Sequence, residues 1–230
     1  ARAAIAATVD VILSRSITGN SIGAKLTIPQ GTLFTDSSGN SWLSARDVTW
    51  YSNVTTCKVP IIQHEKYTAS ALNNMVIPTG DRVIIHLGTL PNGKYYEQGS
   101  MSLQIGGETW VLVDTFAKSK PTDKHFMVSV DESLSPYIMF GDGTFGKKPA
   151  AGAKITNVVF YLTNGTQGNV KSNTITSVPS VISSSITDAT VSNAYDAGGG
   201  SNYENFTMLK EHIPLSVKTL GVAITKEDFE

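Results

Sequence analysis

The fold class is decided by the stretch Met101-Ser102-Leu103-Gln104-Ile105-Gly106-Gly107-Glu108-Thr109-Trp110-Val111-Leu112-Val113. Apolar and polar residues alternate on both sides of the glycine pair, a period that is typical of half-buried β-strands. Two adjacent glycines supply the positive φ angles that a two-residue hairpin turn requires. The stretch therefore predicts a β-hairpin within an antiparallel sheet.

The same two-residue period recurs over most of residues 8–192. A second hairpin is predicted at residues 32–45, around the turn cluster 36–40. Further strands are predicted at residues 22–28, 57–61, 82–87, 126–130, 137–140 and 155–163. Pro60 indicates an edge strand or the end of one, because proline cannot donate to a central ladder. The apolar run 82–87 is predicted to be covered on both faces.

The texture of the sequence changes after the glycine run at residues 198–200. Ser201 and Glu204 have capping-box spacing and predict a short helix that Pro214 ends. We therefore predict a mainly β protein, with an antiparallel sandwich or barrel-like body and a short α-helical segment near the C-terminus, α+β overall. The predicted segments are an N-terminal β region (1–70), a central β domain (71–197) and a glycine-rich linker with the helical segment (198–230). Both ends suggest a fragment of a longer polypeptide.

Composition argues against several classes of partner. The 230 residues carry 18 Lys+Arg and 19 Asp+Glu, a net charge of -1, and charged residues make up only 16%. This balance lacks the basic stripe expected of a protein that binds nucleic acid or an anionic membrane. No apolar run approaches the roughly 18 residues that a membrane span needs. The single cysteine, Cys57, excludes an internal disulfide and a cysteine-based zinc site.

The sequence offers no convincing catalytic or cofactor motif. Residues 141–146 read Gly-Asp-Gly-Thr-Phe-Gly and match the dinucleotide fingerprint by letter, but Pro149 and Gly152 disfavour the helix that must follow it. We interpret this stretch as a glycine-shaped turn between two strands. The four histidines have no metal-ligand spacing, and no GxSxG nucleophile elbow is present. We therefore predict a protein that is not an enzyme and holds no cofactor or metal.

Three segments together resemble one known family. Residues 137–155, Tyr-Ile-Met-Phe-Gly-Asp-Gly-Thr-Phe-Gly-Lys-Lys-Pro-Ala-Ala-Gly-Ala-Lys-Ile, are similar to the FGDGxxGxxPxxG signature of the baseplate J-like family of contractile phage tails, which includes the wedge protein of T4-type phages. As in that family, a strand (156–163) and a small-residue turn ending in Gly-Asn (164–169) follow. The glycine run with its downstream residues 199–230 resembles the family's GGSxxE…P…AVTxEDYE run, and residues 26–32 resemble its IPxGT turn.

This resemblance implies a structural subunit without catalysis. Wedge proteins of this kind form a ring around the tail hub, contact a second copy and other wedge or sheath-initiator subunits, and transmit the contraction signal to the sheath. It implies a place in the virion, at the tail baseplate, after assembly in the bacterial host cytoplasm, and no nucleic-acid, membrane or small-molecule partner. The candidate turn and interface residues are Gly141, Asp142, Gly143, Gly146, Lys147, Pro149, Gly152, Asn164, Gly165, Gly168, Asn169, Gly199 and Gly200.

Two other readings stay open at this point. A β-sandwich adhesin or carbohydrate-binding module of a tail fibre or cell surface would use Trp50 or the pair Tyr95-Tyr96 as a sugar-stacking platform. A glycoside hydrolase on a β scaffold would need two carboxylates at a set separation across a cleft, which sequence does not reveal.

Overall fold

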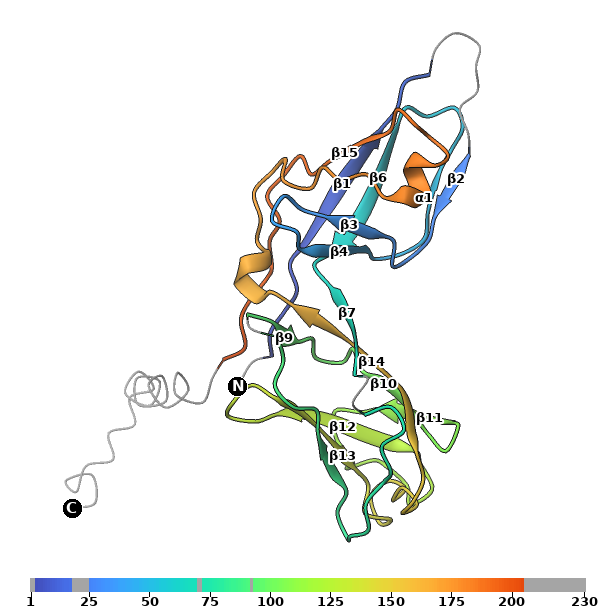
Figure 1. The fold of residues 1–230 in the computed structure, drawn as a ribbon, viewed down its shortest axis with the longest axis vertical. Helices are drawn as coiled ribbons and strands as arrows, with labels where there is room; N and C mark the ends of the chain where they lie inside the picture. Colours follow the sequence, from blue (N-terminus) through green and yellow to red (C-terminus); the bar gives the residue numbers. More distant parts are fainter. Residues whose placement is uncertain (1–2, 18–24, 70–71, 92, 205–230) are drawn as a thin grey trace, which may run out of the picture.

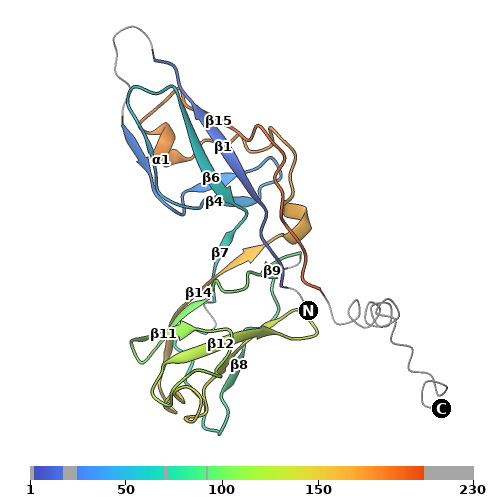
Figure 2. The same ribbon diagram turned by 180° about the vertical axis from the view of Figure 1, so that it is seen from behind.

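The structure, a computed structural model, describes residues 3–17, 25–69, 72–91 and 93–204. These residues form two β lobes, one above the other in Figure 1, and Figure 2 shows the same division from behind. The split lobe is built from residues 3–63 and 165–204, and the inserted lobe from residues 64–164 between them. The prediction of a mainly β protein is confirmed.

The split lobe contains a five-stranded sheet in the order β15-β1-β6-β4-β3 and a separate two-stranded sheet, β2-β5. Its strands are β1 (Thr8–Ser14), β2 (Leu26–Ile28), β3 (Leu33–Thr35), β4 (Ser41–Ser44), β5 (Val48–Trp50), β6 (Thr56–Ile62) and β15 (Thr190–Ser192). A short 3-10 helix, η1 (Gly165–Gly168), and the four-residue helix α1 (Ser180–Ser183) lie on the returning chain. Residues 201–204 are not helical, and the rest of the helix predicted after Ser201 lies outside the described residues.

The inserted lobe contains a curled sheet in the order β7-β14-β10-β11-β12-β13-β8, with β9 paired to β14. Its strands are β7 (Glu65–Thr68), β8 (Ile84–His86), β9 (Tyr95–Tyr96), β10 (Ser102–Ile105), β11 (Glu108–Leu112), β12 (His125–Val130), β13 (Pro136–Phe140) and β14 (Ile155–Thr163). Most pairs are antiparallel, whereas β11 and β12 are parallel.

Both predicted hairpins form. Strands β10 and β11 pair through Leu103 and Trp110, and the turn glycines have φ angles of 59° at Gly106 and 81° at Gly107. Such a pair of positive angles defines a turn whose twist matches that of the flanking strands. Strands β3 and β4 pair with Leu33 opposite Leu43, as the turn cluster predicts.

Two strand predictions are wrong in detail. Pro60 lies in the middle of β6, a central strand, and not at an edge or an end. Pro60 lies opposite Asp10 at a position where β6 makes no hydrogen bond to β1. The N–H that proline lacks would therefore point toward β4. Strand β4 has already ended there, and Ala45, just after it, donates to the Pro60 carbonyl at 2.9 Å. The run 82–87 is covered on one face only, because Val83 and Ile85 are buried while Ile84, on the opposite face, is 46% exposed.

Each lobe has its own hydrophobic core. The core of the split lobe packs Trp42, Phe34 and Val59 from the first part of the chain against Ile182 and Val191 from the last part. The core of the inserted lobe consists of side chains between residues 69 and 162, and five of them are aromatic: Tyr96, Trp110, Phe126, Phe140 and Phe160. Because burial of apolar surface is the main stabilising term, each core is expected to hold its lobe together.

This division differs from the predicted segments. The limits 70/71 and 197/198 do not coincide with the points at which the chain passes between the cores, which are residues 63/64 and 164/165. Residues 198–201, predicted as the start of a linker, instead pair with the N-terminal segment, since Thr8 donates to the Gly198 carbonyl and Ile5 to the Ser201 carbonyl, each at 2.9 Å. Among the described residues, no helix has the length and apolar character to cross a membrane.

Candidate functional site

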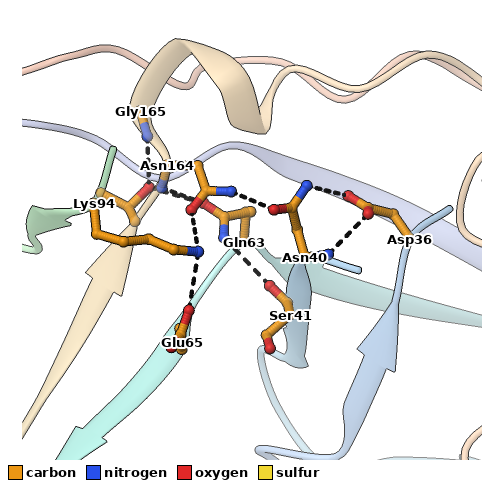
Figure 3. Close-up of polar contacts among 9 residues, drawn as sticks. Asp36, Asn40, Ser41, Gln63, Glu65, Lys94, Asn164 and Gly165 are labelled. Carbon is orange, nitrogen blue, oxygen red and sulfur yellow. Dashed lines mark hydrogen bonds and ion pairs between the residues drawn. The ribbon is translucent and has the colours of Figure 1, made fainter. Parts of the chain in front are cut away.

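The two passages of the chain between the lobes meet at one buried polar junction. Gln63 ends the first passage at the tip of β6, and Asn164 begins the second directly after β14. Gln63 is 0% exposed and Asn164 is 5% exposed. The Gln63 side-chain oxygen Oε1 accepts hydrogen bonds from the Asn164 backbone N–H at 2.6 Å and from the Thr163 hydroxyl at 3.1 Å. The junction therefore ties both passages to one side chain (Figure 3).

Asn164 extends this junction into both lobes. Its Nδ2 donates to Asn40 Oδ1 in the split lobe at 2.7 Å, and its Oδ1 accepts a 2.6 Å hydrogen bond from Lys94 Nζ in the inserted lobe. Lys94 Nζ also lies 2.9 Å from Glu65 Oε2. As Figure 3 shows, the contacts form a continuous chain from Asp36 through Asn40, Asn164 and Lys94 to Glu65.

Asp36 anchors the split-lobe end of this chain. Its carboxylate accepts hydrogen bonds from the Asn40 side chain at 3.0 Å, from Trp42 Nε1 at 3.1 Å and from the backbone N–H groups of Ser38 and Asn40. Burial alone would raise the pKa of Asp36, but these donors outweigh it and hold the pKa below its usual value. Asp36 is therefore a fixed anion that orients Asn40 toward Asn164.

Next to η1, residues near Gly165 and Gly200 pack very closely against each other at the junction. A side chain at Gly200 would collide with the Gly165 carbonyl, and one at Gly165 would collide with Asn202. Asn169 holds Gly200 in place by donating to its carbonyl at 2.9 Å and accepting from its N–H at 2.8 Å. Only glycine fits at positions where two backbones come this close.

The predicted turn and interface residues thus divide into two groups. The turn 164–169 and the glycine run 199–200, about thirty residues apart in the sequence, meet at the junction: Asn164, Gly165 and Gly168 form one side, and Asn169 contacts Gly200. Next to them Gly199 has a φ angle of 84°. The other group, Gly141 to Gly152, lies beyond the opposite end of β14, about 30 Å away by strand length.

The loop 141–146 in that second group is tightly closed. The Asp142 carboxylate accepts hydrogen bonds from the backbone N–H groups of Phe145 and Thr144 at 2.9 and 2.8 Å, and these contacts lower its pKa. Gly143 N–H donates to the Gly146 carbonyl at 3.0 Å, with a φ angle of 95° at Gly143. Gly141 is so close to the Gly146 backbone that no side chain fits there.

The rest of the second group completes the same region. Lys147 N–H donates to the Asp123 carbonyl at 2.7 Å, and Gly152 N–H donates to the Ile77 carbonyl at 3.0 Å. Pro149 is buried. The sequence interpretation as a turn between two strands agrees with this geometry, since β13 precedes the loop and β14 is the next strand.

An apolar groove of about 590 Å³ lies beside this loop. Its lining includes Ile84, Phe116, Met127, Met139 and Phe145. Phe145 is 54% exposed, a large apolar surface for a side chain at the tip of a loop.

Two of the three aromatic residues proposed as a sugar platform, Trp50 and Tyr96, are buried, whereas Tyr95 is half-buried. Trp50 is 1% exposed, and its Nε1 donates to the Val54 carbonyl at 3.0 Å. Tyr96 is 3% exposed and packs edge-on against Phe160. Stacking on a sugar needs an open ring face, which these two side chains lack.

Sequence reasoning missed Gln63, Asn40, Asp36 and Lys94 as members of the junction. The available signal was the abrupt change from Ile61-Ile62 to Gln63-His64-Glu65-Lys66, where the apolar alternation of a strand stops. That signal marks an end of burial, but it does not reveal which distant residue Gln63 contacts.

Comparisons with known proteins give little guidance. No family model and no curated protein matches the chain. Among solved structures, the chain is similar to a component of the anti-feeding prophage (AFP) baseplate, determined by cryo-EM and six-fold symmetrised, with 14% sequence identity and a TM-score of 0.29. The match covers 93% of this chain and 38% of that one, so the chain spans well under half of its length. At these values the likeness assigns neither a fold nor a function.

Proposed function

We propose that the chain is a structural subunit of a contractile phage tail baseplate, of the wedge type. One observation carries the proposal: two family-like segments of the sequence, 164–169 and the glycines at 199–200, meet at the junction that ties the two lobes together. We expect the characteristic residues of a family at positions where its members need the same rigid geometry. In a ring of subunits that transmits force, that requirement is a fixed angle between lobes.

The chemistry of the junction supports this mechanical role. Gln63 and Asn164 are buried, and opening the junction would exchange their hydrogen bonds for bonds to water. Each hydrogen bond between protein groups contributes about 0.5–1.5 kcal/mol net, so the loss of several together disfavours the opened state. The two lobes are then expected to move as one body, and a displacement imposed on one lobe reaches the other.

The surface also suits a subunit that is held by its neighbours. Strand β8 ends its sheet, and β3 ends the five-stranded sheet of the split lobe with Leu33 52% exposed. Exposed edge strands invite pairing with other chains, and proteins that stay monomeric usually protect them. We propose that a second copy and other wedge or sheath-initiator subunits cover such edges in the tail, after assembly in the host cytoplasm.

We propose that the subunit has no catalytic role. Within the described ranges, no three histidine, cysteine or acidic side chains gather in a way that could hold a metal ion. Burial raises the pKa of the Cys57 thiol, which disfavours the thiolate that a nucleophilic cysteine needs.

A deletion experiment tests the proposal. Removal of the gene from cells that produce the contractile particles should leave tubes and sheaths that do not join into complete tails in electron micrographs. The wild-type gene supplied in trans should restore complete particles. Normal, contractile particles from the deletion strain would overturn the proposal.

A further inference from the structure

Strand β8 presents an unpaired backbone edge. Its other side pairs with β13, where Phe140 N–H donates to the Val83 carbonyl at 3.2 Å and Leu87 N–H donates to the Pro136 carbonyl at 3.0 Å. Backbone groups of an antiparallel strand alternate in direction, so the N–H and C=O groups of Ile84 and His86 face away from β13. In the part of the chain that the structure describes, no residue bonds to these groups.

The side chains along this edge define a recognisable pattern. Arg82, Ile84 and His86 are all exposed and alternate with the buried Val83 and Ile85, so they share the outer face of the sheet. Along this face the side chains are therefore basic at Arg82, apolar at Ile84 and an imidazole at His86.

The apolar surface continues from Ile84 across the sheet. Ile84 lies opposite Met139, and Met139 lies opposite Met127, which gives an apolar row over three strands. This row lies in the groove beside loop 141–146, with Phe145 at its rim. Flexible methionine side chains adapt to different apolar partners and are common at binding surfaces.

We propose that β8 accepts an extended segment of a different subunit as an added strand. The occupant pairs with the backbone of Ile84 and His86, places an apolar side chain beside Ile84 at the groove, and carries acidic residues opposite Arg82 and His86. Main-chain bonds supply affinity in this mode, and the alternate side chains supply specificity. The identification of the strand donor as a neighbouring baseplate subunit rests on the proposed function. The proposal that the β8 edge accepts a strand does not depend on that function.

The charge pattern argues for a different subunit and against a second copy. If two copies of β8 paired about Ile84, Arg82 of each would lie opposite His86 of the other, with no acidic residue between them. Asp142 on loop 141–146 is held mainly by two backbone N–H groups, and the Arg82 charge is the smallest of the influences on its pKa. A strand with acidic, apolar and acidic residues on one face complements the edge better than β8 itself does.

A short peptide tests the proposal on the purified chain. The probe is Ac-Ser-Glu-Thr-Val-Thr-Glu-Ser-NH2, tested in the antiparallel register, in which the valine lies opposite Ile84 and the two glutamates lie opposite Arg82 and His86. Titration followed by backbone NMR should shift the amide signals of Ile84 and His86 most. N-methylation of the valine, whose N–H faces β8 when it lies opposite Ile84, should weaken binding about tenfold or more, because it removes a backbone hydrogen bond and adds a clash.

The matched controls separate backbone pairing from loose contact. N-methylation of a threonine, whose N–H points away from β8, should leave binding within about twofold, and lysine in place of both glutamates should weaken it about tenfold. On the protein, Ile84→Pro removes an outward N–H without touching the β13 ladder and should abolish binding in a folded protein. Ile84→Thr keeps that N–H and should retain binding.

Several results would overturn the proposal. One is the absence of amide shifts up to the solubility limit of the peptide, and another is equal binding of the two N-methyl peptides. A third is a dimer, seen by sedimentation equilibrium, that Ile84→Pro abolishes, because the occupant of the edge would then be a second copy. Because the titration needs no tail, its failure is distinguishable from failure of the proposed function, which the deletion strain measures.

Discussion

The side-chain oxygen of Gln63 accepts a 2.6 Å hydrogen bond from the backbone N–H of Asn164, a residue 101 positions later in the chain. Both residues are buried, and they close the insertion of one lobe into the other. The junction between the lobes is therefore a buried, hydrogen-bonded part of the fold. The predictions below test what that junction and the two groups of glycines contribute.

Loss of the Gln63 amide should destabilise the protein markedly. Gln63→Leu fills a similar volume but leaves the Asn164 N–H without its acceptor, and we expect a loss of about 2–3 kcal/mol in the free energy of unfolding. Urea denaturation measures it. The matched control is Gln104→Leu, at a partly exposed glutamine whose hydrogen bonds, to Thr109 at 3.4 Å and from Asn157 Nδ2 at 2.7 Å, lie at the surface where water replaces them, and we expect a change below about 0.5 kcal/mol there. Equal effects of the two substitutions would contradict a special role for Gln63.

The Asp36 carboxylate should make stability depend on pH in the acid range. Its pKa is lower in the folded protein than the usual value of 3.8, so its contribution is fully present above that value and is lost as the pH falls through the folded pKa. The stability difference between the wild type and Asp36→Asn should therefore shrink between neutral pH and pH about 3.

NMR titration supplies a second measure of the same carboxylate. Trp42→Phe removes one donor to Asp36, so the pKa of Asp36 should rise toward its usual value. An unchanged pKa in that variant would refute the assignment of Trp42 as one of the donors that lower it.

The glycines of the 141–146 loop should differ in sensitivity. Gly143→Val forces a β-branched residue to a φ angle of 95° and should cost about 1–3 kcal/mol. Gly141→Ala should cost at least about 2 kcal/mol, because its Cβ would meet backbone atoms of Gly146 that cannot rotate away. Thermal unfolding of both variants measures this. The account of the loop fails if either variant melts like the wild type and assembles normally.

Two neighbouring glycines near the C-terminal end of the described chain offer a matched pair. Gly200→Ala would place a methyl group against the Gly165 carbonyl and 2.8 Å from Asn169 Oδ1, and should cost about 2 kcal/mol. Gly198→Ala meets open space and should change stability by less than about 0.5 kcal/mol. Limited proteolysis should likewise cut the junction faster in Gly200→Ala than in Gly198→Ala. A reversed order would mean that the 164–169 turn and the glycine run do not pack as described.

The local parts of the fold were predictable because their causes are local. Gly106-Gly107 between alternating residues specifies a hairpin by its own backbone geometry, and the polar cluster at 36–40 does the same for β3 and β4. The exposure of Ile84 was not predictable, because an apolar run reads alike whether one face or both are covered. Pro60 is tolerated in a central strand only because β4 ends beside it, which is a tertiary fact.

The junction shows the same limit more clearly. The sequence pointed to Asn164 and Gly165 as a turn, and to Gly199 and Gly200 as a change of texture, each from its own composition. Nothing local joins them to one another or to Gln63. Contacts across 101 residues arise from the packing of two cores and not from any pattern within a window.

The most direct test of the central claim is immunogold labelling of contractile particles, purified from cells that encode this chain, with antibody raised against it. A baseplate subunit of the wedge type predicts label confined to the tail end, beside the point where tube and sheath meet. Label on distal fibres, or particles without label while the soluble protein reacts, would contradict that account.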